Sequence, residues 1–314
     1  MAFGFVFPGQ GSQSVGMLGA LAQAGGAEPS IRDTFAEASA VLGYDLWQLV
    51  AQGPAERLNS TECTQPAMLA ASIATWRVWR SRGGSEPAVV SGHSLGEFSA
   101  LVAAGALDFA AAVDLVRFRG QVMQEAVPAG TGAMAAILGL EDQQVIEACR
   151  EAAQGGVVEA VNFNAPGQVV IAGAREPVQR AIEAAKQRGA KRAVALAVSV
   201  PSHSSLMRPA AQRLGERLAA IEFRVPRIRF VSAVDASPHE EAADLRRLLI
   251  RQLSSPVRWT DTVRSLVTAG IGTVIECGPG KVLTALNRRI ERSLGSLALE
   301  DADSLQAALA AVQA

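Results

Sequence analysis

The chain has 314 residues, of which 49% are hydrophobic and 19% charged, and its formal net charge is −1. This composition is typical of a globular α/β protein and excludes disordered and fibrous proteins, while the length suggests roughly two domains. A nearly neutral chain gives no reason to expect nucleic acid or an anionic membrane as a partner. The three cysteines and three histidines fit neither a disulfide framework nor a histidine-rich metal site, so we expect no bound metal.

The N-terminal part of the chain predicts a strand followed by two helices. The apolar run at residues 3–7 is typical of a buried parallel strand, and it ends in the Gly-rich turn at residues 8–12. The run is too short for a signal sequence or a membrane span, so we expect a soluble, cytoplasmic protein. The turn lacks the third glycine and the lysine of phosphate-binding loops. One predicted helix begins near Ser30 and ends at Gly43, and another carries Pro66 in its first turn.

The central motif is Gly92-His93-Ser94-Leu95-Gly96, the only G-x-S-x-G in the sequence. An apolar run at residues 88–90 precedes it and an apolar-periodic segment follows it. Strand, sharp turn and helix in that order are the context of a nucleophile elbow, which exposes a serine hydroxyl above a helix N-terminus. An ordinary Gly-rich turn with a solvated serine would explain the five residues alone equally well.

Asp108 is the predicted N-cap of a helix over residues 109–127. Arg119 falls within an apolar stripe of this helix, whereas Arg117 lies on the polar side. A buried arginine is costly unless it meets an anion. Contact with an anionic ligand, snorkelling to the surface and an internal pair with a carboxylate are all compatible with this position.

The pattern between residues 129 and 197 predicts a separate small domain. Its elements are strand 133–138, helix 141–153, strand 157–163, a turn at 164–167, strand 169–172, helix 176–188 and strand 192–200. The order β-α-β-β-α-β is ferredoxin-like. We therefore predict an α/β fold in which residues 1–128 and 198–314 form a large domain with a parallel sheet, and residues 129–197 are inserted into it.

The part of the chain after residue 200 contains two of the three histidines. His203 opens a helix that runs to about residue 218, and it is either a buried neutral histidine or the base that a nucleophilic serine needs. His239 lies in a polar loop and is expected to be exposed. His93 is too close to Ser94 in sequence to turn onto it, so we expect it to shape the elbow.

The remaining predicted elements are strand 228–234, helices 241–253 and 257–268, strand 273–277 and helix 282–292. Gly278-Pro279-Gly280 is either a tight turn or a set of backbone donors for an anion. Asp303 is the predicted N-cap of a C-terminal amphipathic helix.

These motifs together resemble the bacterial malonyl-CoA:acyl carrier protein transacylase family, nearly from end to end. The motifs are Gly9-Gln10-Gly11-Ser12-Gln13, Gly92-His93-Ser94-Leu95-Gly96-Glu97, Arg119-Gly120, Asn162-Phe163-Asn164-Ala165-Pro166-Gly167-Gln168, Val200-Pro201-Ser202-His203 and Gly278-Pro279-Gly280-Lys281-Val282-Leu283. One departure is Cys277, where relatives often carry valine.

The resemblance implies an α/β-hydrolase-like large domain with a ferredoxin-like insert and an active site between them. It implies Ser94 as nucleophile, His203 as general base, the backbone N–H groups of Gln10 and Leu95 as the oxyanion hole, Arg119 as the partner of the substrate carboxylate, and the backbone carbonyl of Gln252 as the group that orients the histidine. His93 and Asn162 are further candidates for the pocket.

The implied reaction is transfer of a malonyl group from malonyl-CoA to the pantetheine thiol of acyl carrier protein through a malonyl-serine, for fatty acid synthesis. The coenzyme A thioester is then a substrate, and no permanently bound cofactor is expected. A free-standing polyketide acyltransferase and a serine esterase or thioesterase remain as alternatives. A silent carrier-binding module is disfavoured because every catalytic position is filled.

Overall fold

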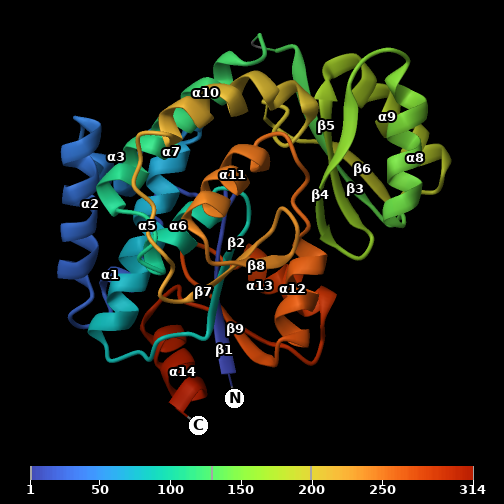
Figure 1. The fold of residues 1–314 in the computed structure, drawn as a ribbon. Helices are drawn as coiled ribbons and strands as arrows, with labels where there is room; N and C mark the ends of the chain where they lie inside the picture. The colour runs from blue at the N-terminus through green and yellow to red at the C-terminus, as the bar shows by residue number, and fades with distance from the viewer. Residues whose placement is uncertain (1, 129, 199, 314) are drawn as a thin grey trace.

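The computed structural model of the protein describes residues 2–128, 130–198 and 200–313. Three limits of the predicted domains lie outside these ranges, at residues 1, 129 and 314. Ser199, within the predicted strand 192–200, also lies outside them. The described chain forms two β-sheets with helices packed around them (Figure 1). None of its described helices combines the length and hydrophobicity that a membrane crossing requires.

The larger sheet has six strands in the order β10-β9-β1-β2-β7-β8. All neighbouring pairs are parallel except β7 and β8, which are antiparallel. Because the carboxyl ends of parallel strands meet at one edge, the turns after β1 and β2 lie side by side there. The strands are β1 (Ala2–Phe7), β2 (Val89–Gly92), β7 (Arg229–Ser232), β8 (Ser237–His239), β9 (Ile271–Glu276) and β10 (Gly295–Ala298).

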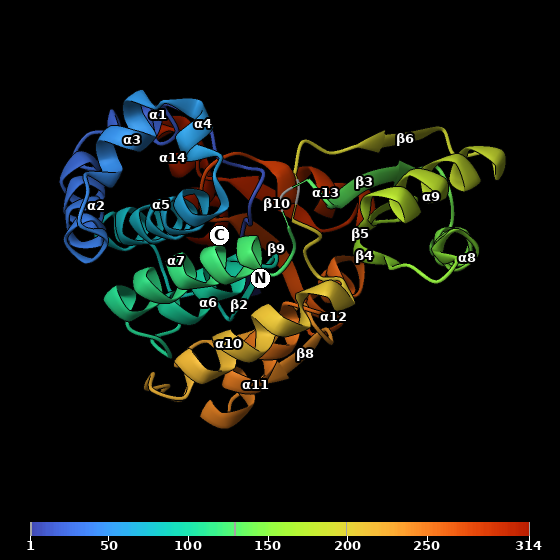
Figure 2. The ribbon, with the colours of Figure 1, turned by 90° about the horizontal axis from the view of Figure 1, so that it is seen from above.

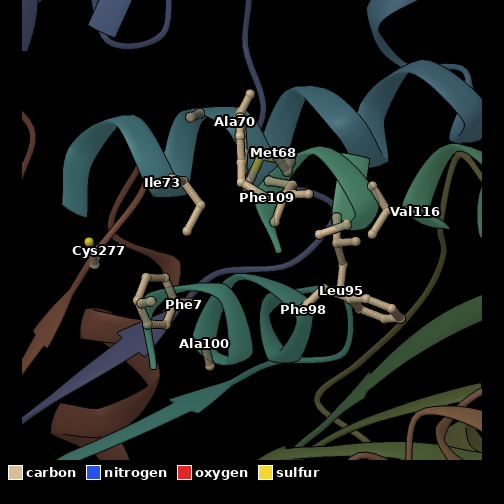
Figure 3. Packing of buried hydrophobic residues seen from close by; sticks show 14 of the residues in the cluster. Phe7, Met68, Ala70, Ile73, Leu95, Phe98, Ala100, Phe109, Val116 and Cys277 are labelled. Carbon is tan, nitrogen blue, oxygen red and sulfur yellow. The ribbon is translucent and has the colours of Figure 1, made fainter. Parts of the chain in front are cut away.

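Helices cover both faces of this sheet, as the apolar run at residues 3–7 predicts for a buried parallel strand. Phe5 and Phe7 of β1 belong to the larger core on one face, whereas Val6 belongs to the core on the other. Figure 3 shows Phe7 in the larger core together with Ile73 and Phe98 from two helices. That core includes residues of α2 (Glu28–Leu42), α5 (Thr61–Ser81), α6 (Gly96–Ala103), α7 (Phe109–Glu125), α10 (Arg208–Leu218), α11 (Ala242–Gln252) and α14 (Ala302–Gln313).

The opposite core is formed with α12 (Trp259–Thr268) and α13 (Val282–Ile290). Four short helical segments complete the large part of the structure. These are α1 (Gly19–Ala22), α3 (Leu46–Gln52), α4 (Ala55–Leu58) and the 3-10 helix η1 (Ser205–Met207).

The smaller sheet has four antiparallel strands in the order β4-β5-β3-β6. Two helices cover its side that faces away from the larger sheet (Figure 2) and enclose a separate apolar core with it. In chain order its elements are β3 (Gly132–Leu138), α8 (Asp142–Ala153), β4 (Val158–Ala165), β5 (Gln168–Ala174), α9 (Arg175–Gln187) and β6 (Arg192–Ala195). The predicted order of strands and helices in this segment is therefore confirmed.

Backbone hydrogen bonds join β4 to the large part of the protein. Phe163 donates to the carbonyl of Val257 at 2.9 Å, and Val257 donates to the carbonyl of Val161 at 2.8 Å. The hydroxyl of Thr260 also donates to the carbonyl of Phe163, at 3.1 Å. These bonds fix the small sheet against the segment that leads into α12.

Two predicted helix starts are wrong. Pro66 lies inside α5, which begins at Thr61, because the N–H groups of Cys63 and Thr64 already donate to the carbonyl of Ser60 at 2.9 and 2.8 Å. At the C-terminus, the N–H of Ser304 donates to the side chain of Asp301 at 2.8 Å. Asp301, not Asp303, therefore occupies the capping position of α14.

The predicted strand 192–200 is also too long, because β6 ends at Ala195. The alternation of Val194, Leu196 and Val198 resembles a half-buried strand, yet these three side chains are 43%, 39% and 39% exposed. Residues 192–195 pair with β3 on one side only, as the edge of the sheet. Smaller boundary shifts occur elsewhere: α2 begins at Glu28 rather than near Ser30, and α13 ends at Ile290.

Candidate active site

Ser94 lies at the turn between β2 and α6, with a φ of 53°. This left-handed conformation is uncommon for a residue other than glycine and is the strained turn that an elbow requires. The flanking glycines are needed because the backbone is so close. A Cβ on Gly92 would lie 2.0 Å from the carbonyl carbon of Gly96, and a Cβ on Gly96 would lie 2.0 Å from the carbonyl oxygen of Phe7.

His203 contacts Ser94 through one ring nitrogen and Gln252 through the other. The distance from His203 Nε2 to Ser94 Oγ is 2.7 Å, and the distance from Nδ1 to the main-chain oxygen of Gln252 is also 2.7 Å. A carbonyl oxygen can only accept, so Nδ1 carries the hydrogen and Nε2 is left to accept the serine proton. Burial, and next the charge of Arg119, lower the pKa of His203 to about 3, so the ring is neutral and can act as a base.

Arg119 extends from α7 toward Ser94, and its side chain is buried, with the residue only 2% exposed. Its Nη1 donates to Gln65 Oε1 at 2.8 Å, its Nη2 donates to Gln252 Oε1 at 2.9 Å, and the same Nη2 lies 3.3 Å from Ser94 Oγ. Snorkelling is therefore excluded, and the hydrogen-bond partners of this guanidinium within the described residues are neutral side chains rather than carboxylates. Burial lowers the pKa of Arg119 to about 10, which still leaves it charged at neutral pH.

A cavity of about 750 Å³ opens onto Ser94, His203 and Arg119, and it is lined by strands of the smaller sheet and by turns and helices of the large part of the protein. Gln10 and Leu95 line it as well. Among the described residues, neither of their backbone N–H groups has a hydrogen-bond acceptor. Two free donors beside a serine hydroxyl are what an oxyanion site requires.

The two further pocket candidates also line this cavity. His93 Nε2 lies 2.8 Å from Asn164 Oδ1 of β4, so the histidine connects the elbow to the small sheet. Burial lowers the pKa of His93. The Oδ1 atom of Asn162 is buried and, within the described part of the chain, has no hydrogen-bond partner.

The sequence prediction missed Gln65, gave no role to Glu97 although this residue closes the motif around Ser94, and assigned to Gln252 only its main-chain carbonyl. Glu97 is fully buried, and its side chain accepts hydrogen bonds from Ser232 Oγ at 2.8 Å, Ala233 N at 2.6 Å and Gln252 Nε2 at 2.5 Å. The available signal was a glutamate in the first turn of an otherwise apolar helix. His239, expected to be exposed, is half-buried, and its Nε2 lies 3.1 Å from a carboxylate oxygen of Asp235.

Residues 4–312 match the family model described as an acyl transferase domain. The malonyl CoA-acyl carrier protein transacylase of Escherichia coli (strain K12) is 56% identical over 307 residues, which cover 98% of each chain. The chain belongs to this transacylase family. It is accordingly an acyltransferase.

Solved structures of the transacylase family share the whole fold. An acyl carrier protein S-malonyltransferase from Vibrio cholerae is 56% identical, with a TM-score of 0.95 over 98% of this chain and 100% of that chain. A malonyl-transacylase solved in complex with its type II polyketide synthase (PKS) acyl-carrier protein is 55% identical, with a TM-score of 0.97 over 99% of this chain and 100% of that chain. The mixed α/β fold with a parallel sheet and a second, separate sheet is thus that of the transacylases.

Proposed function

We propose that this protein transfers a malonyl group from malonyl-CoA to the pantetheine thiol of an acyl carrier protein, and that Ser94 carries the group between them. The observation that supports this most is the position of Arg119, whose Nη2 lies 3.3 Å from Ser94 Oγ. A buried cation beside the nucleophile suits an acyl group that has a carboxylate of its own. Malonyl is such a group, and its carboxylate can meet the guanidinium with two parallel hydrogen bonds.

His203 Nε2 accepts the Ser94 proton as Oγ attacks the thioester carbonyl. The negative charge that develops on the carbonyl oxygen is bound by the N–H groups of Gln10 and Leu95, each of which can contribute about 3 kcal/mol to such a transition state. Coenzyme A then leaves as its thiol, with the proton returned from His203. In the second half of the reaction the carrier's pantetheine thiol gives its proton to His203 and attacks the malonyl-serine. The bond between Ser94 Oγ and the carbonyl carbon then breaks, malonyl-carrier leaves, and His203 returns the proton to Ser94 Oγ.

A hydrolase would use the same serine and histidine but would pass the acyl group to water. Hydrolases of this elbow type orient the histidine with a carboxylate, whereas the contact of His203 Nδ1 here is the carbonyl of Gln252. Acyl transfer is therefore the better interpretation. Fatty acid synthesis is the proposed source of the carrier, and a polyketide carrier is the alternative.

We propose that the chain forms two domains. Residues 1–128 and 198–314 form an α/β-hydrolase-like catalytic domain, and residues 129–197 form a ferredoxin-like domain. The strand order of the smaller sheet supports the second name, since its first strand in the chain lies between the fourth and the third. We place the protein in the cytoplasm, where its three free cysteines would remain reduced. We expect no permanently bound cofactor or metal.

Intact-mass measurement tests the function directly. Incubation with malonyl-CoA alone should add one malonyl group to the peptide that contains Ser94, and later addition of carrier protein with its pantetheine arm should remove it and yield malonyl-carrier. Ser94→Ala should stay folded and lose both steps. Labelling of Cys63, Cys149 or Cys277 instead, or release of free malonate as the main product, would contradict the proposal.

A further inference from the structure

We propose that Glu97 is a positioning residue that fixes the orientation of the Gln252 side-chain amide and, through it, the direction of the Arg119 guanidinium. This inference rests on the proposed role of Arg119 as the partner of the malonyl carboxylate. Glu97 touches neither Ser94 Oγ nor His203 in the structure. It would act on substrate choice through two intervening side chains.

The carboxylate of Glu97 has a donor on each oxygen. Its Oε1 accepts from Ser232 Oγ and from the N–H of Ala233, and its Oε2 accepts from Gln252 Nε2. A backbone N–H cannot change its role, so Oε1 is committed to β7 and the residue that follows it. Oε2 is thereby held toward Gln252.

An amide side chain has one end that donates and one that accepts, and its surroundings decide which way it lies. Gln252 Nε2 donates to two oxygen acceptors, Glu97 Oε2 at 2.5 Å and the carbonyl oxygen of Ser94 at 2.8 Å. The opposite end, Oε1, therefore faces Arg119 Nη2 at 2.9 Å. A reversed amide would place oxygen against two acceptors and an NH₂ group against a guanidinium that only donates.

This arrangement directs the guanidinium without neutralising it. Besides the Ser94 hydroxyl, at 3.3 Å from Nη2, the side-chain acceptors that hold Arg119 Nη1 and Nη2 among the described residues are the neutral amide oxygens of Gln65 and Gln252. A carboxylate in direct contact would compete with the substrate for the same donors. Glu97 contacts Gln252 and not Arg119, so the guanidinium stays available for the carboxylate of the substrate.

The test is Glu97→Gln, which exchanges one carboxylate oxygen for an NH₂ group. Because Ala233 N–H requires an acceptor, the new amide oxygen must take the place of Oε1, and its NH₂ must then face Gln252 Nε2. Gln252 would turn or withdraw, and Arg119 Nη2 would lose its amide acceptor and keep only the longer contact with Ser94 Oγ. We expect kcat/KM for malonyl-CoA to fall about tenfold, the scale of one hydrogen bond to a charged group. Acetyl-CoA, which has no free carboxylate, should stay within about twofold.

Glu276→Gln is the matched control. Glu276 is also fully buried, and its carboxylate accepts from Leu283 N at 3.1 Å, Thr284 N at 2.7 Å and Thr284 Oγ1 at 2.8 Å. It lies at the end of β9 and, among the described residues, does not line the cavity of Ser94. This variant should lose thermal stability and keep its preference for malonyl-CoA.

Gln252→Met provides a second variant should Glu97→Gln fail to fold. It removes the amide and keeps the main-chain carbonyl that holds His203, so it should show the same loss of preference for malonyl-CoA. Equal losses with both thioesters, or an unchanged preference, in either folded variant would overturn the inference. Malonylation of Ser94 in the unaltered protein tests the proposed function separately, so the two can fail independently.

Discussion

The Nδ1 atom of His203 lies 2.7 Å from the main-chain oxygen of Gln252, a neutral acceptor in the position where many serine enzymes place a carboxylate. The carbonyl selects the tautomer and holds the ring, as an aspartate would, but adds no negative charge. Without that charge, burial and Arg119 together keep the histidine unprotonated. The carbonyl of Gln252 therefore selects the tautomer of the imidazole, whereas burial and the charge of Arg119 keep it unprotonated.

Removal of the imidazole should be far more harmful than removal of any single acid. We expect His203→Ala to lower kcat by at least about 10⁴-fold, the effect known for the loss of a triad member. No Asp→Asn or Glu→Gln change should reach that size, since the histidine is oriented by a carbonyl. Steady-state kinetics of the variants decides this, and one amide variant as inactive as His203→Ala would indicate a triad.

Arg119→Ala should change substrate preference rather than abolish serine chemistry. We expect kcat/KM for malonyl-CoA to fall at least about 10²-fold, because roughly 3 kcal/mol is at stake in a buried charged pair. Acetyl-CoA turnover should hold steady or rise, because the acetyl group has no carboxylate to pair with the guanidinium. Parallel kinetics with the two thioesters measures the split.

Arg117→Ala is the control for this arginine. Arg117 is on the same helix, its side chain is 35% exposed, and its Nη2 pairs with Asp114 at 2.7 Å. Arg117 and Asp114 form a partly exposed pair at the surface, where ion pairs contribute about 0 to 1 kcal/mol, so activity should change little. If malonyl-CoA and acetyl-CoA turnover fell equally in Arg119→Ala, Arg119 would have a structural role and not a selective one.

The pKa of His203 predicts an unusual pH profile for Ser94. An imidazole at its ordinary pKa of 6.5 would be half protonated at that pH, and the protonated half could not act as a base. Burial lowers the pKa to about 3, so the base should remain neutral as the pH falls from 8 to 5. We expect an uncharged sulfonyl fluoride to modify Ser94 at a rate that stays nearly constant over this range. A rate that halves near pH 6.5 would show an ordinary, accessible histidine.

The elbow should tolerate no added methyl group. In Gly92→Ala the Cβ would collide with backbone atoms of Gly96 and Glu97 at 2.0 to 2.2 Å, and backbone cannot move aside cheaply. We expect a loss of at least about 3 kcal/mol in the free energy of unfolding, or failure to fold. Gly19→Ala, where nothing lies within 4 Å of the new Cβ, should be neutral or slightly stabilising. Chemical denaturation of both variants compares them.

The sequence predicted the parts of the fold that depend on local pattern. The apolar run before Ser94 and the periodic segment after it became β2 and α6, and the Asp108 cap holds, with its side chain accepting from Ala111 N at 2.9 Å. Local pattern also caused the errors. Because proline is common in the first turn of a helix, Pro66 predicts a helix start there, yet α5 begins five residues earlier, at Thr61.

The contacts among Glu97, Gln252 and Arg119 could not be predicted in the same way. Each joins residues that are 133 or more positions apart in the chain, and neither periodicity nor a motif encodes which amide oxygen meets which guanidinium. The stripe of α7 did predict that Arg119 would be buried and in need of a partner. Only the packing of α11 against the elbow supplies Gln252 as one of the groups that hold it.

The bonds between β4 and Val257 have a consequence for the protein during its synthesis. The ribosome makes Ser94 early, but His203, Gln252 and the Val257 anchor of the small sheet all emerge more than a hundred residues later. Strand β9, which lies next to β1 in the centre of the large sheet, emerges later still. Although domains of nascent chains often fold in order of synthesis, a partial chain here has a serine without its base and a sheet without one of its central strands. A nascent chain that ends before Gln252 therefore lacks the contacts that position His203 to activate Ser94.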